Sequence, residues 1–339
     1  MSQSKKTPNR PPVFSIIGSG SWATALLKIL EHNGYQVKWW IRQNQDLESI
    51  QEHQRNPKYM GSLAIDLSKV TLTNQIKEAV QDADIVLLAV PSFFLENALR
   101  GLSKKDLKNK LVVSTIKGII PSGHQLVTDY LNSHFGVLYE NLVVLSGPSH
   151  AEEVAYGRMT YLTIGSHSKA NSDQLCHVFK TDYLNFKTSE DITGIEYTAV
   201  FKNIYAIISG ISNSMGYGDN FQAVLVNNAL KELAQMLDAF TSSSRNIMDS
   251  VYMGDLLVTA YSQFSRNRTF GNMLGKGYSK KAALMEMNMV PEGYYAVQPA
   301  YELVEENNVN APIVAAAFRI IHENISPGIE IRILEDKLE

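Results

Sequence analysis

Apolar residues follow two different spacings along this chain, and the change between them predicts two kinds of structure. Up to about residue 190, short runs rich in β-branched and aromatic residues alternate with stretches of helical spacing. The runs predicted as strands cover 13–17, 36–41, 69–73, 85–90, 111–115, 142–145 and 161–164. Nearly continuous apolar strands that alternate with helices, such as 22–33 and 93–102, are typical of a largely parallel sheet covered on both faces.

Beyond residue 190, β-branched runs become scarce and long segments with helical spacing take over. The longest of these predicted helices cover 197–213, 221–240, 253–263 and 311–324. We therefore predict an α/β protein with an N-terminal doubly wound sheet over 13–190 and an all-helical C-terminal domain over 191–339. The polar segment 1–12 is expected to be a disordered tail.

Length and charge narrow the class of protein further. The 339 residues exceed the roughly 250–300 at which single hydrophobic cores stop growing, so two domains are expected. With 31 Lys and Arg against 34 Asp and Glu, the net charge of −3 argues against a protein that wraps nucleic acid. The sequence has one cysteine, no apolar run near the roughly 20 residues of a membrane span, and a polar N-terminus. We expect a cytoplasmic protein with no internal disulfide, no metal and no stable membrane insertion.

A glycine motif follows the first predicted strand directly. The segment GSGSWA at 18–23 reads G-x-G-x-x-A. Gly18 permits a tight turn, Gly20 lets a pyrophosphate approach the backbone, and Ala23 lets the next helix pack closely on the strand. The start of that helix offers free N–H groups and a positive dipole to phosphates. Because the motif lies between a strand and a helix, it predicts dinucleotide binding by a Rossmann-type domain.

Arg42 ends the second predicted strand, where an NAD-specific protein usually has Asp or Glu to bind the ribose hydroxyls. An arginine there can receive the 2′-phosphate of NADP, whereas Asp46, one helical turn further, keeps NAD possible. The pattern favours NADP over NAD. It also leaves open that Arg42 is only a solvated charge.

Two lysines are candidates for chemistry. Lys202, followed by Asn203, interrupts an otherwise apolar helical segment, and a buried lysine is costly unless it has a partner or a function. A general acid–base residue requires this kind of setting. Lys117 follows the strand LVVST, at the sheet edge where ligands bind, but many lysines in such positions are only surface charges.

Two further polar groups lie in the second half. Asp255 and Thr259 are four residues apart and share one helix face, either as a site or as a plain polar stripe. The segment SRNR at 265–268 joins two arginines to two hydrogen-bonding side chains. Guanidinium groups pair bidentately with phosphate, so this segment is either a phosphate clamp or a solvated loop.

Together these motifs resemble the bacterial-type NAD(P)-dependent glycerol-3-phosphate dehydrogenases. The matching segments, in family order from residue 13 to about residue 295, are GSGSWATAL, VPS, STIKGI, LSGPSHAEEVAYG, the block from GIEYTAVFKNIYAI through GYGDN, GDLLVT, SRNRTFG and VPEGY. The resemblance implies reversible hydride transfer that interconverts dihydroxyacetone phosphate and sn-glycerol 3-phosphate. It also implies a supply of glycerol 3-phosphate for glycerophospholipid synthesis.

The resemblance implies a role for each matching position. Lys202 would accept and donate the proton of the substrate hydroxyl. The substrate would be bound by Lys117, Gly147, Ser149, Asn203, Asp255, Thr259, Ser265, Arg266 and Asn267. The dinucleotide would be lined by Gly18, Gly20, Ser21, Trp22, Ala23, Arg42, Lys117, Ala151, Arg266, Val290 and Glu292.

The chain departs from the family pattern at a few positions: Ala23 stands where many members have glycine, His150 replaces a phenylalanine, and Asn228 replaces an arginine. Two other functions stay open. One is another Lys-dependent two-domain hydroxyacid dehydrogenase, such as a ketopantoate- or hydroxyisobutyrate-type reductase, whose carboxylate substrate Arg266 could also bind. The other is a non-catalytic dinucleotide sensor, which would leave Lys202 unexplained. The expected partner is a small phosphorylated substrate, and a homodimer is left open.

Overall fold

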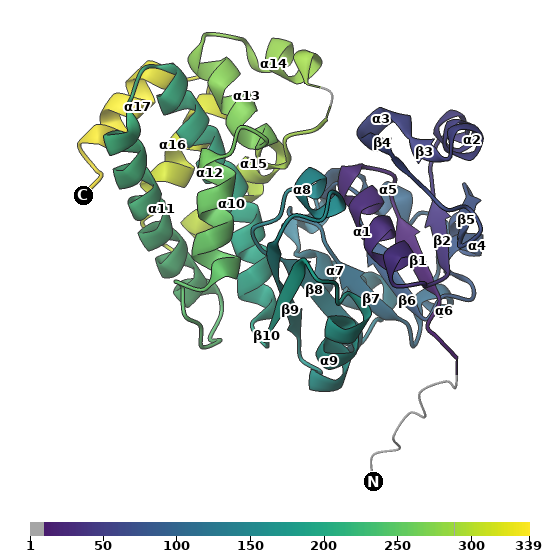
Figure 1. The fold of residues 1–339 in the computed structure, drawn as a ribbon. Helices are drawn as coiled ribbons and strands as arrows, with labels where there is room; N and C mark the ends of the chain where they lie inside the picture. The colour runs from purple at the N-terminus through teal and green to yellow at the C-terminus, as the bar shows by residue number, and fades with distance from the viewer. Residues whose placement is uncertain (1–9, 288) are drawn as a thin grey trace.

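The computed structural model describes residues 10–287 and 289–339. An eight-stranded sheet lies beside a group of helices formed by the second half of the chain (Figure 1). The strands follow the order β10-β9-β8-β7-β6-β1-β2-β5. Their bounds are β1 Phe14–Ile17, β2 Val37–Trp40, β5 Val70–Thr73, β6 Ile85–Leu88, β7 Leu111–Ser114, β8 Leu142–Ser146, β9 Thr160–Ser166 and β10 Leu184–Ser189. A separate antiparallel pair consists of β3 Arg55–Asn56 and β4 Gly61–Ala64.

The sheet is parallel except where β9 pairs antiparallel with β8. Side chains of one strand alternate between two apolar cores, as expected for a sheet covered on both faces. Ile16 of β1 belongs to one core with Trp39 and Leu87, whereas Ile17 belongs to the other with Leu88. The expected α/β class, with a helical C-terminal part, is therefore confirmed.

Helices of the first half connect the strands. Their bounds are α1 Ser21–His32, α2 Asn44–His53, α3 Pro57–Met60, α4 Ile76–Val80, α5 Ser92–Ala98, α6 Lys104–Leu107, α7 Val127–Phe135, α8 Ala151–Ala155 and α9 Lys169–Val178. Each of the seven predicted strands has a counterpart in the sheet. The sequence missed β10, since only the first of its six side chains is fully buried and no apolar run marks it.

The second half is helical throughout its regular elements. The helices are α10 Ile192–Ser214, α11 Asp219–Phe240, α12 Asp255–Tyr261, α13 Arg266–Gly275, α14 Lys280–Glu286, α15 Glu292–Glu306, α16 Pro312–Ile321 and α17 Pro327–Glu335. A π-helical turn, Ser250–Gly254, leads into α12. Helix α10 begins at a cap in which the Asp191 carboxylate accepts the N–H of Gly194 at 3.0 Å.

Helix α10 connects the two parts of the molecule. Ile195, near its start, shares an apolar core with Val144 of β8. Further along, α10 and α13 approach at glycines: a Cβ added to Gly210 would lie 2.1 Å from the Arg268 carbonyl oxygen, and one added to Gly271 would lie 2.0 Å from that of Ile207. Only glycine permits this approach, which places the start of α13 beside the middle of α10.

The N-terminal tail expected over 1–12 lies mostly outside the described residues. Arg10, which is described, makes a bidentate contact with Asp84 at 2.9 and 3.1 Å. Among helices of the described chain, none combines the length and the apolar character that crossing a membrane requires.

Candidate active site

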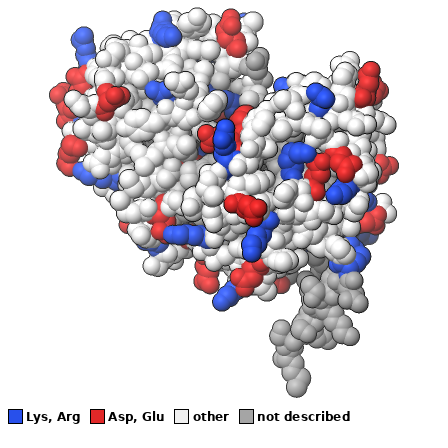
Figure 2. All heavy atoms as spheres, in the orientation of Figure 1, with Lys and Arg blue, Asp and Glu red and all other residues white. Residues whose placement is uncertain are grey.

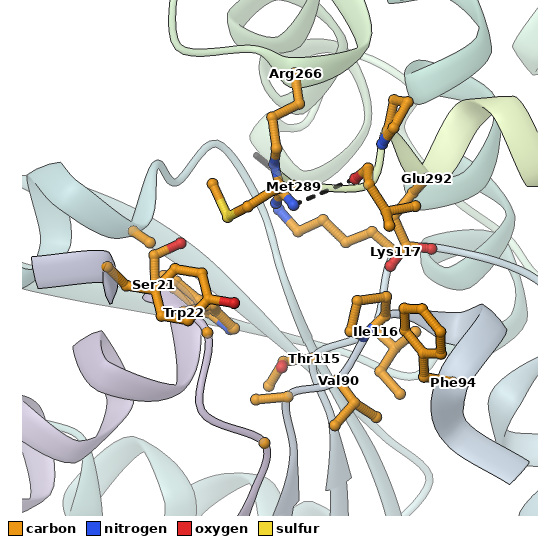
Figure 3. Close-up of a pocket in the computed structure, with 18 of the residues that line it drawn as sticks. Ser21, Trp22, Val90, Phe94, Thr115, Ile116, Lys117, Arg266, Met289 and Glu292 are labelled. Atoms are coloured by element: carbon orange, nitrogen blue, oxygen red, sulfur yellow. Dashed lines mark hydrogen bonds between the residues drawn. The ribbon is translucent and has the colours of Figure 1, made fainter. Parts of the chain in front are cut away.

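A cavity of about 530 Å³ lies where the carboxyl ends of the strands meet the helical part. The surface is hollowed between the two parts, and Lys and Arg are mixed with Asp and Glu over this face (Figure 2). In a close-up of the cavity, Ser21 and Trp22 lie on the left, Arg266 and Met289 at the top, and Thr115 and Val90, just beyond the strand ends, at the bottom (Figure 3). Ligands of open α/β sheets bind at this edge.

The glycine turn forms one wall of the cavity. Gly18 has a φ of +121°, and an added Cβ would lie 2.4 Å from the Ala89 carbonyl oxygen, so no other residue fits there. A Cβ added to Gly20 would meet nothing within 4 Å, which leaves the backbone open toward the cavity. Among the residues that the structure describes, none caps the start of α1 with its side chain, and none gives the buried Trp22 indole N–H an acceptor. These features fit a dinucleotide whose phosphates take up the free N–H groups of the helix start.

Charged side chains after β2 line the same cavity. The Arg42 guanidinium lies 5.7 Å from the centre of the Phe94 ring. Asp46, in the first turn of α2, is 3.5 Å from the Lys58 ammonium of α3. Sequence reasoning missed Lys58 and Phe94, because neither belongs to a motif and only the packing of α3 and α5 brings them to the cavity.

Lys202 and Asp255 form a buried ion pair at the cavity. Their exposed fractions are 2% and 1%, and the Lys202 ammonium contacts Asp255 Oδ1. Lys117 approaches the other carboxylate oxygen, with its Nζ 3.9 Å from Oδ2. Burial lowers the pKa of Lys202; Asp255 opposes that shift and the Lys117 ammonium adds to it. The neutral amine of Lys202 is thus reached at a lower pH than for an ordinary lysine.

Several polar residues expected to bind substrate also fasten the elements around this pair. The Asn203 amide donates to the Lys117 carbonyl oxygen at 3.0 Å, and the Thr259 hydroxyl donates to the Asp255 carbonyl oxygen at 2.6 Å. Asn267 accepts the N–H of Gly293 at 2.9 Å. These bonds position side chains from α10, α12 and α13 around one point, at the end of β7.

Ser149 and Ser265 are both bonded within their own segments. The Ser149 hydroxyl donates to the Gly147 carbonyl oxygen at 3.0 Å. Ser265 caps α13 by accepting the N–H of Arg268 at 3.3 Å. Arg266, the first residue of α13, is exposed, and its guanidinium donates to the Val290 carbonyl oxygen at 3.4 Å. Arg266 therefore keeps donors free for an anion in the cavity.

Glu292 connects the helical part to the sheet part. Its half-buried carboxylate accepts the Ser92 hydroxyl at 2.6 Å and the Ser92 N–H at 3.2 Å, at the start of α5. Burial raises the pKa of Glu292. A Cβ added to Gly118 would lie 2.2 Å from the Ser92 hydroxyl oxygen, so the residue after Lys117 must be glycine.

All the expected site residues line the cavity except Ala23 and Gly147. Ala23 is fully buried in α1, consistent with close packing of helix on strand. Gly147 has a φ of +130°, and an added Cβ would lie 3.0 Å from the Tyr161 carbonyl oxygen. Its own carbonyl oxygen lies 3.5 Å from the Lys117 ammonium. Neither side chain therefore faces the cavity, and of the two only Gly147 reaches a cavity residue, through its carbonyl oxygen.

Of the residues that depart from the family pattern, His150 lies at the cavity and Asn228 lies away from it. His150 lines the cavity with its ring 5.8 Å from that of Phe264, and its buried Nε2 has no hydrogen-bond partner in the part of the chain that the structure describes. Burial lowers the pKa of His150, and the nearby ammonium of Lys117 adds to the shift. Asn228 does not line the cavity, and its side chain donates to the Glu339 carbonyl oxygen at 3.0 Å.

A glycine turn on a doubly wound sheet, facing a lysine buried in an attached helical part, is the architecture of the two-domain nicotinamide-dependent dehydrogenases. Family models identify the branch. The model described as NAD-dependent glycerol-3-phosphate dehydrogenase N-terminus matches residues 14–172, and the model of the C-terminus matches residues 191–331. The chain belongs to the NAD-dependent glycerol-3-phosphate dehydrogenase family.

Individual relatives agree with this assignment. A protein of Oceanobacillus iheyensis named glycerol-3-phosphate dehydrogenase (NAD(P)+) is 35% identical over 314 residues, which cover 92% of this chain and 90% of that protein. A protein of the same name from Staphylococcus aureus is 34% identical over 314 residues, which cover 92% of this chain and 94% of that protein. The crystal structure of glycerol-3-phosphate dehydrogenase from Coxiella burnetii is 26% identical, with a TM-score of 0.90 over 95% of this chain and 98% of that chain.

A more distant structure shares only the fold. A ketopantoate reductase family protein from Ralstonia eutropha is 16% identical, with a TM-score of 0.60 over 96% of this chain and 99% of that chain. The hydroxyacid-reductase alternative raised by the sequence therefore has the same architecture, and only the residues of the site separate the two activities.

Proposed function

We propose that this chain is an NAD(P)-dependent glycerol-3-phosphate dehydrogenase that interconverts dihydroxyacetone phosphate and sn-glycerol 3-phosphate, with Lys202 as its catalytic residue. The buried Lys202–Asp255 pair carries the proposal, because an ammonium with a lowered pKa beside a cavity is suited to moving a proton. The glycine turn and Arg266 line the same cavity, so a dinucleotide and a phosphorylated substrate can meet there.

Lys202 manages the proton of the reacting hydroxyl. In the direction of reduction, the protonated amine stabilises the charge that develops on the carbonyl oxygen and then donates its proton. In the direction of oxidation, the neutral amine accepts the hydroxyl proton. Asp255 holds the ammonium in place, and the nearby Lys117 favours release of its proton. A bound nicotinamide supplies or accepts the hydride at C2 of the substrate.

Arg266 binds the phosphate group of the substrate. Its exposed guanidinium is suited to bidentate pairing with phosphate oxygens, and Lys117 adds a second cation at the cavity. Binding the remote phosphate places C2 at a defined distance from Lys202. Ser149, Asn203 and Thr259 complete the polar lining around the substrate.

NADP is the favoured dinucleotide. The family name and the names of the relatives admit both NAD and NADP. Arg42 lines the cavity at the end of β2, where a guanidinium can pair with a 2′-phosphate. In this proposal residues 13–190 bind the dinucleotide and residues 191–339 bind the substrate. The enzyme works in the cytoplasm on a small phosphorylated substrate and supplies glycerol 3-phosphate for glycerophospholipid synthesis.

Oxidation of NADPH and NADH in the presence of dihydroxyacetone phosphate tests the activity. Arg266→Ala should raise KM for that substrate roughly ten- to a hundredfold, because a hydrogen bond to a charged group contributes about 1.5–3 kcal/mol. Arg332→Ala removes an exposed arginine outside the cavity and should leave KM unchanged. An unchanged KM in Arg266→Ala, or equal turnover of a 2-keto carboxylate such as ketopantoate, would contradict the proposal.

A further inference from the structure

Three charged side chains line the cavity beyond β2. Arg42 follows the strand. Among the described residues, its guanidinium lies beside the Phe94 ring and forms no ion pair with a carboxylate. Asp46 lies four residues further, with its side chain 26% exposed. Lys58 comes from α3 and reaches Asp46 with an Nζ–Oδ2 distance of 3.5 Å. The only negative charge of the three is therefore already paired.

The segment that carries Lys58 is fastened to the glycine turn. Asn56, two residues earlier, is 2% exposed. Its amide donates to the Ser19 carbonyl oxygen and to the Thr24 hydroxyl, each at 2.9 Å. Ser19 belongs to the turn that faces the cavity. These two hydrogen bonds hold the segment of Lys58 in a fixed position beside the glycine turn.

The ion pair adds little to the stability of the fold, because the Lys58 side chain is 53% exposed and exposed pairs are weakened by solvent. The pair matters more for a bound ligand, because its two charges have opposite effects on a 2′-phosphate. A free Asp46 carboxylate would accept hydrogen bonds from ribose hydroxyls and repel a 2′-phosphate, whereas an ammonium beside it offsets that repulsion and attracts the phosphate.

We propose that the Asp46–Lys58 pair sets the choice between NADP and NAD, with Lys58 as the residue that permits the 2′-phosphate beside Arg42. This inference rests on the proposed function, since it concerns the same dinucleotide site. Lys58 neutralises Asp46 and adds a second cation for the phosphate. Without Lys58, the carboxylate of Asp46 makes the site selective for the unphosphorylated ribose.

Titration with two dinucleotide fragments tests the pair separately from catalysis. Adenosine 2′,5′-bisphosphate carries the 2′-phosphate, and adenosine 5′-monophosphate lacks it. Lys58→Met should weaken binding of the bisphosphate by about fivefold or more, while binding of the monophosphate stays within about twofold. Asp46→Asn should strengthen bisphosphate binding, and Lys58→Arg should keep the selectivity of the parent.

Lys38→Met is the matched control. Lys38 lies on β2, its ammonium is 3.0 Å from Asp82, and it does not line the cavity. The substitution also removes one positive charge and one ion pair, but outside the cavity, so it reports the long-range effect of net charge. Equal changes in Lys58→Met and Lys38→Met, or equal loss of both fragments in Lys58→Met, would overturn the inference.

The two proposals fail in different ways. If the parent reduces dihydroxyacetone phosphate but Lys58→Met has the same preference for NADPH over NADH, the inference about the ion pair is wrong and the proposed function stands. If the proteins bind the fragments as expected but the parent reduces dihydroxyacetone phosphate with neither dinucleotide, the proposed function is wrong and the inference about the ion pair stands.

Discussion

Lys202 has buried apolar neighbours along α10, including Phe201 and Ile204. An ammonium in such surroundings costs several kcal/mol unless a partner offsets the lost hydration. Asp255 is that partner, and it comes from a different helix. Burial lowers the pKa of Lys202 and the contact with Asp255 opposes that shift, so the balance between the two sets the pH at which the lysine gives up its proton.

Replacing Lys202 by methionine tests its role as proton donor and acceptor. We expect Lys202→Met to lower the rate of hydride transfer by at least about a hundredfold, the low end of general acid–base catalysis. Dinucleotide affinity should persist, because the glycine turn belongs to the other part of the molecule. Single-turnover hydride transfer and dinucleotide titration on the same preparation measure both.

Lys231→Met is the control for loss of one lysine, since Lys231 pairs with Glu339 at 3.3 Å outside the cavity. Near-normal turnover in a folded Lys202→Met protein that binds the dinucleotide would show that the proton comes from another group. Lys117 would then be the next candidate, since its ammonium is 3.9 Å from Asp255.

At the scale of elements, the contact between α10 and α13 brings the proposed catalytic lysine and the proposed phosphate ligand together. Lys202 lies in α10 and Arg266 begins α13. The two backbones touch where Gly271 faces the carbonyl oxygen of Ile207 and Gly210 faces that of Arg268. A side chain at either glycine would push the helices apart and move the start of α13.

Gly271→Ala tests this contact. We expect a loss of about 1–3 kcal/mol in the free energy of unfolding, the usual cost of overpacking, together with a raised KM for dihydroxyacetone phosphate. Gly218→Ala is the control, because an added Cβ there meets nothing within 4 Å and its φ of −79° suits any residue. Denaturant unfolding and steady-state kinetics measure the two effects. Equal stability of the two variants would show that α13 can shift without cost.

At the scale of the whole molecule, two glutamates of the helical part accept hydrogen bonds from helix starts of the sheet part. Glu292 of α15 accepts from Ser92 at the start of α5. Glu196 of α10 accepts from the hydroxyl and the N–H of Thr128 in the first turn of α7. Burial raises the pKa of Glu196 to about 7. One of the two contacts between the parts of the chain, that of Glu196, therefore depends on a carboxyl group that titrates near neutral pH.

The protonation of Glu196 makes stability depend on pH with a definite sign. Its pKa of about 7 lies above the ordinary 4.5, so between these values the folded state keeps a proton that the unfolded state releases. The stabilising contribution is fully present below about pH 4.5 and is lost as the pH rises through 7. We expect the free energy of unfolding of the parent to fall between pH 5 and pH 8 by roughly 1–3 kcal/mol more than that of Glu196→Gln.

Glu190→Gln provides the control, since Glu190 is exposed and close in sequence. It should follow the pH dependence of the parent. Thermal unfolding of all three proteins at several pH values gives the comparison. A parent and a Glu196→Gln variant with parallel pH profiles would mean that Glu196 keeps its ordinary pKa in the folded state.

The sequence alone determined the strands of the central sheet and the glycine turn, because these depend on local spacing. A strand buried on both faces needs a continuous apolar run, and the turn needs glycine at a position such as Gly18, where φ is positive. Two other segments gave no such signal: β10 has a single buried side chain among its six, and β3 with β4 is a short pair.

Only the tertiary structure decided which charges meet. Lys202 and Asp255 come from different helices, and their contact depends on how α10 packs beside α12. The contact of Ser92 with Glu292 joins residues 200 positions apart, and no motif pointed to Lys58. Periodicity along a chain reports which side of an element is buried, whereas a pair of charges forms where distant elements are packed together. The pattern of residues therefore predicted the sheet and the turn, and the packing of helices against them completed the candidate site.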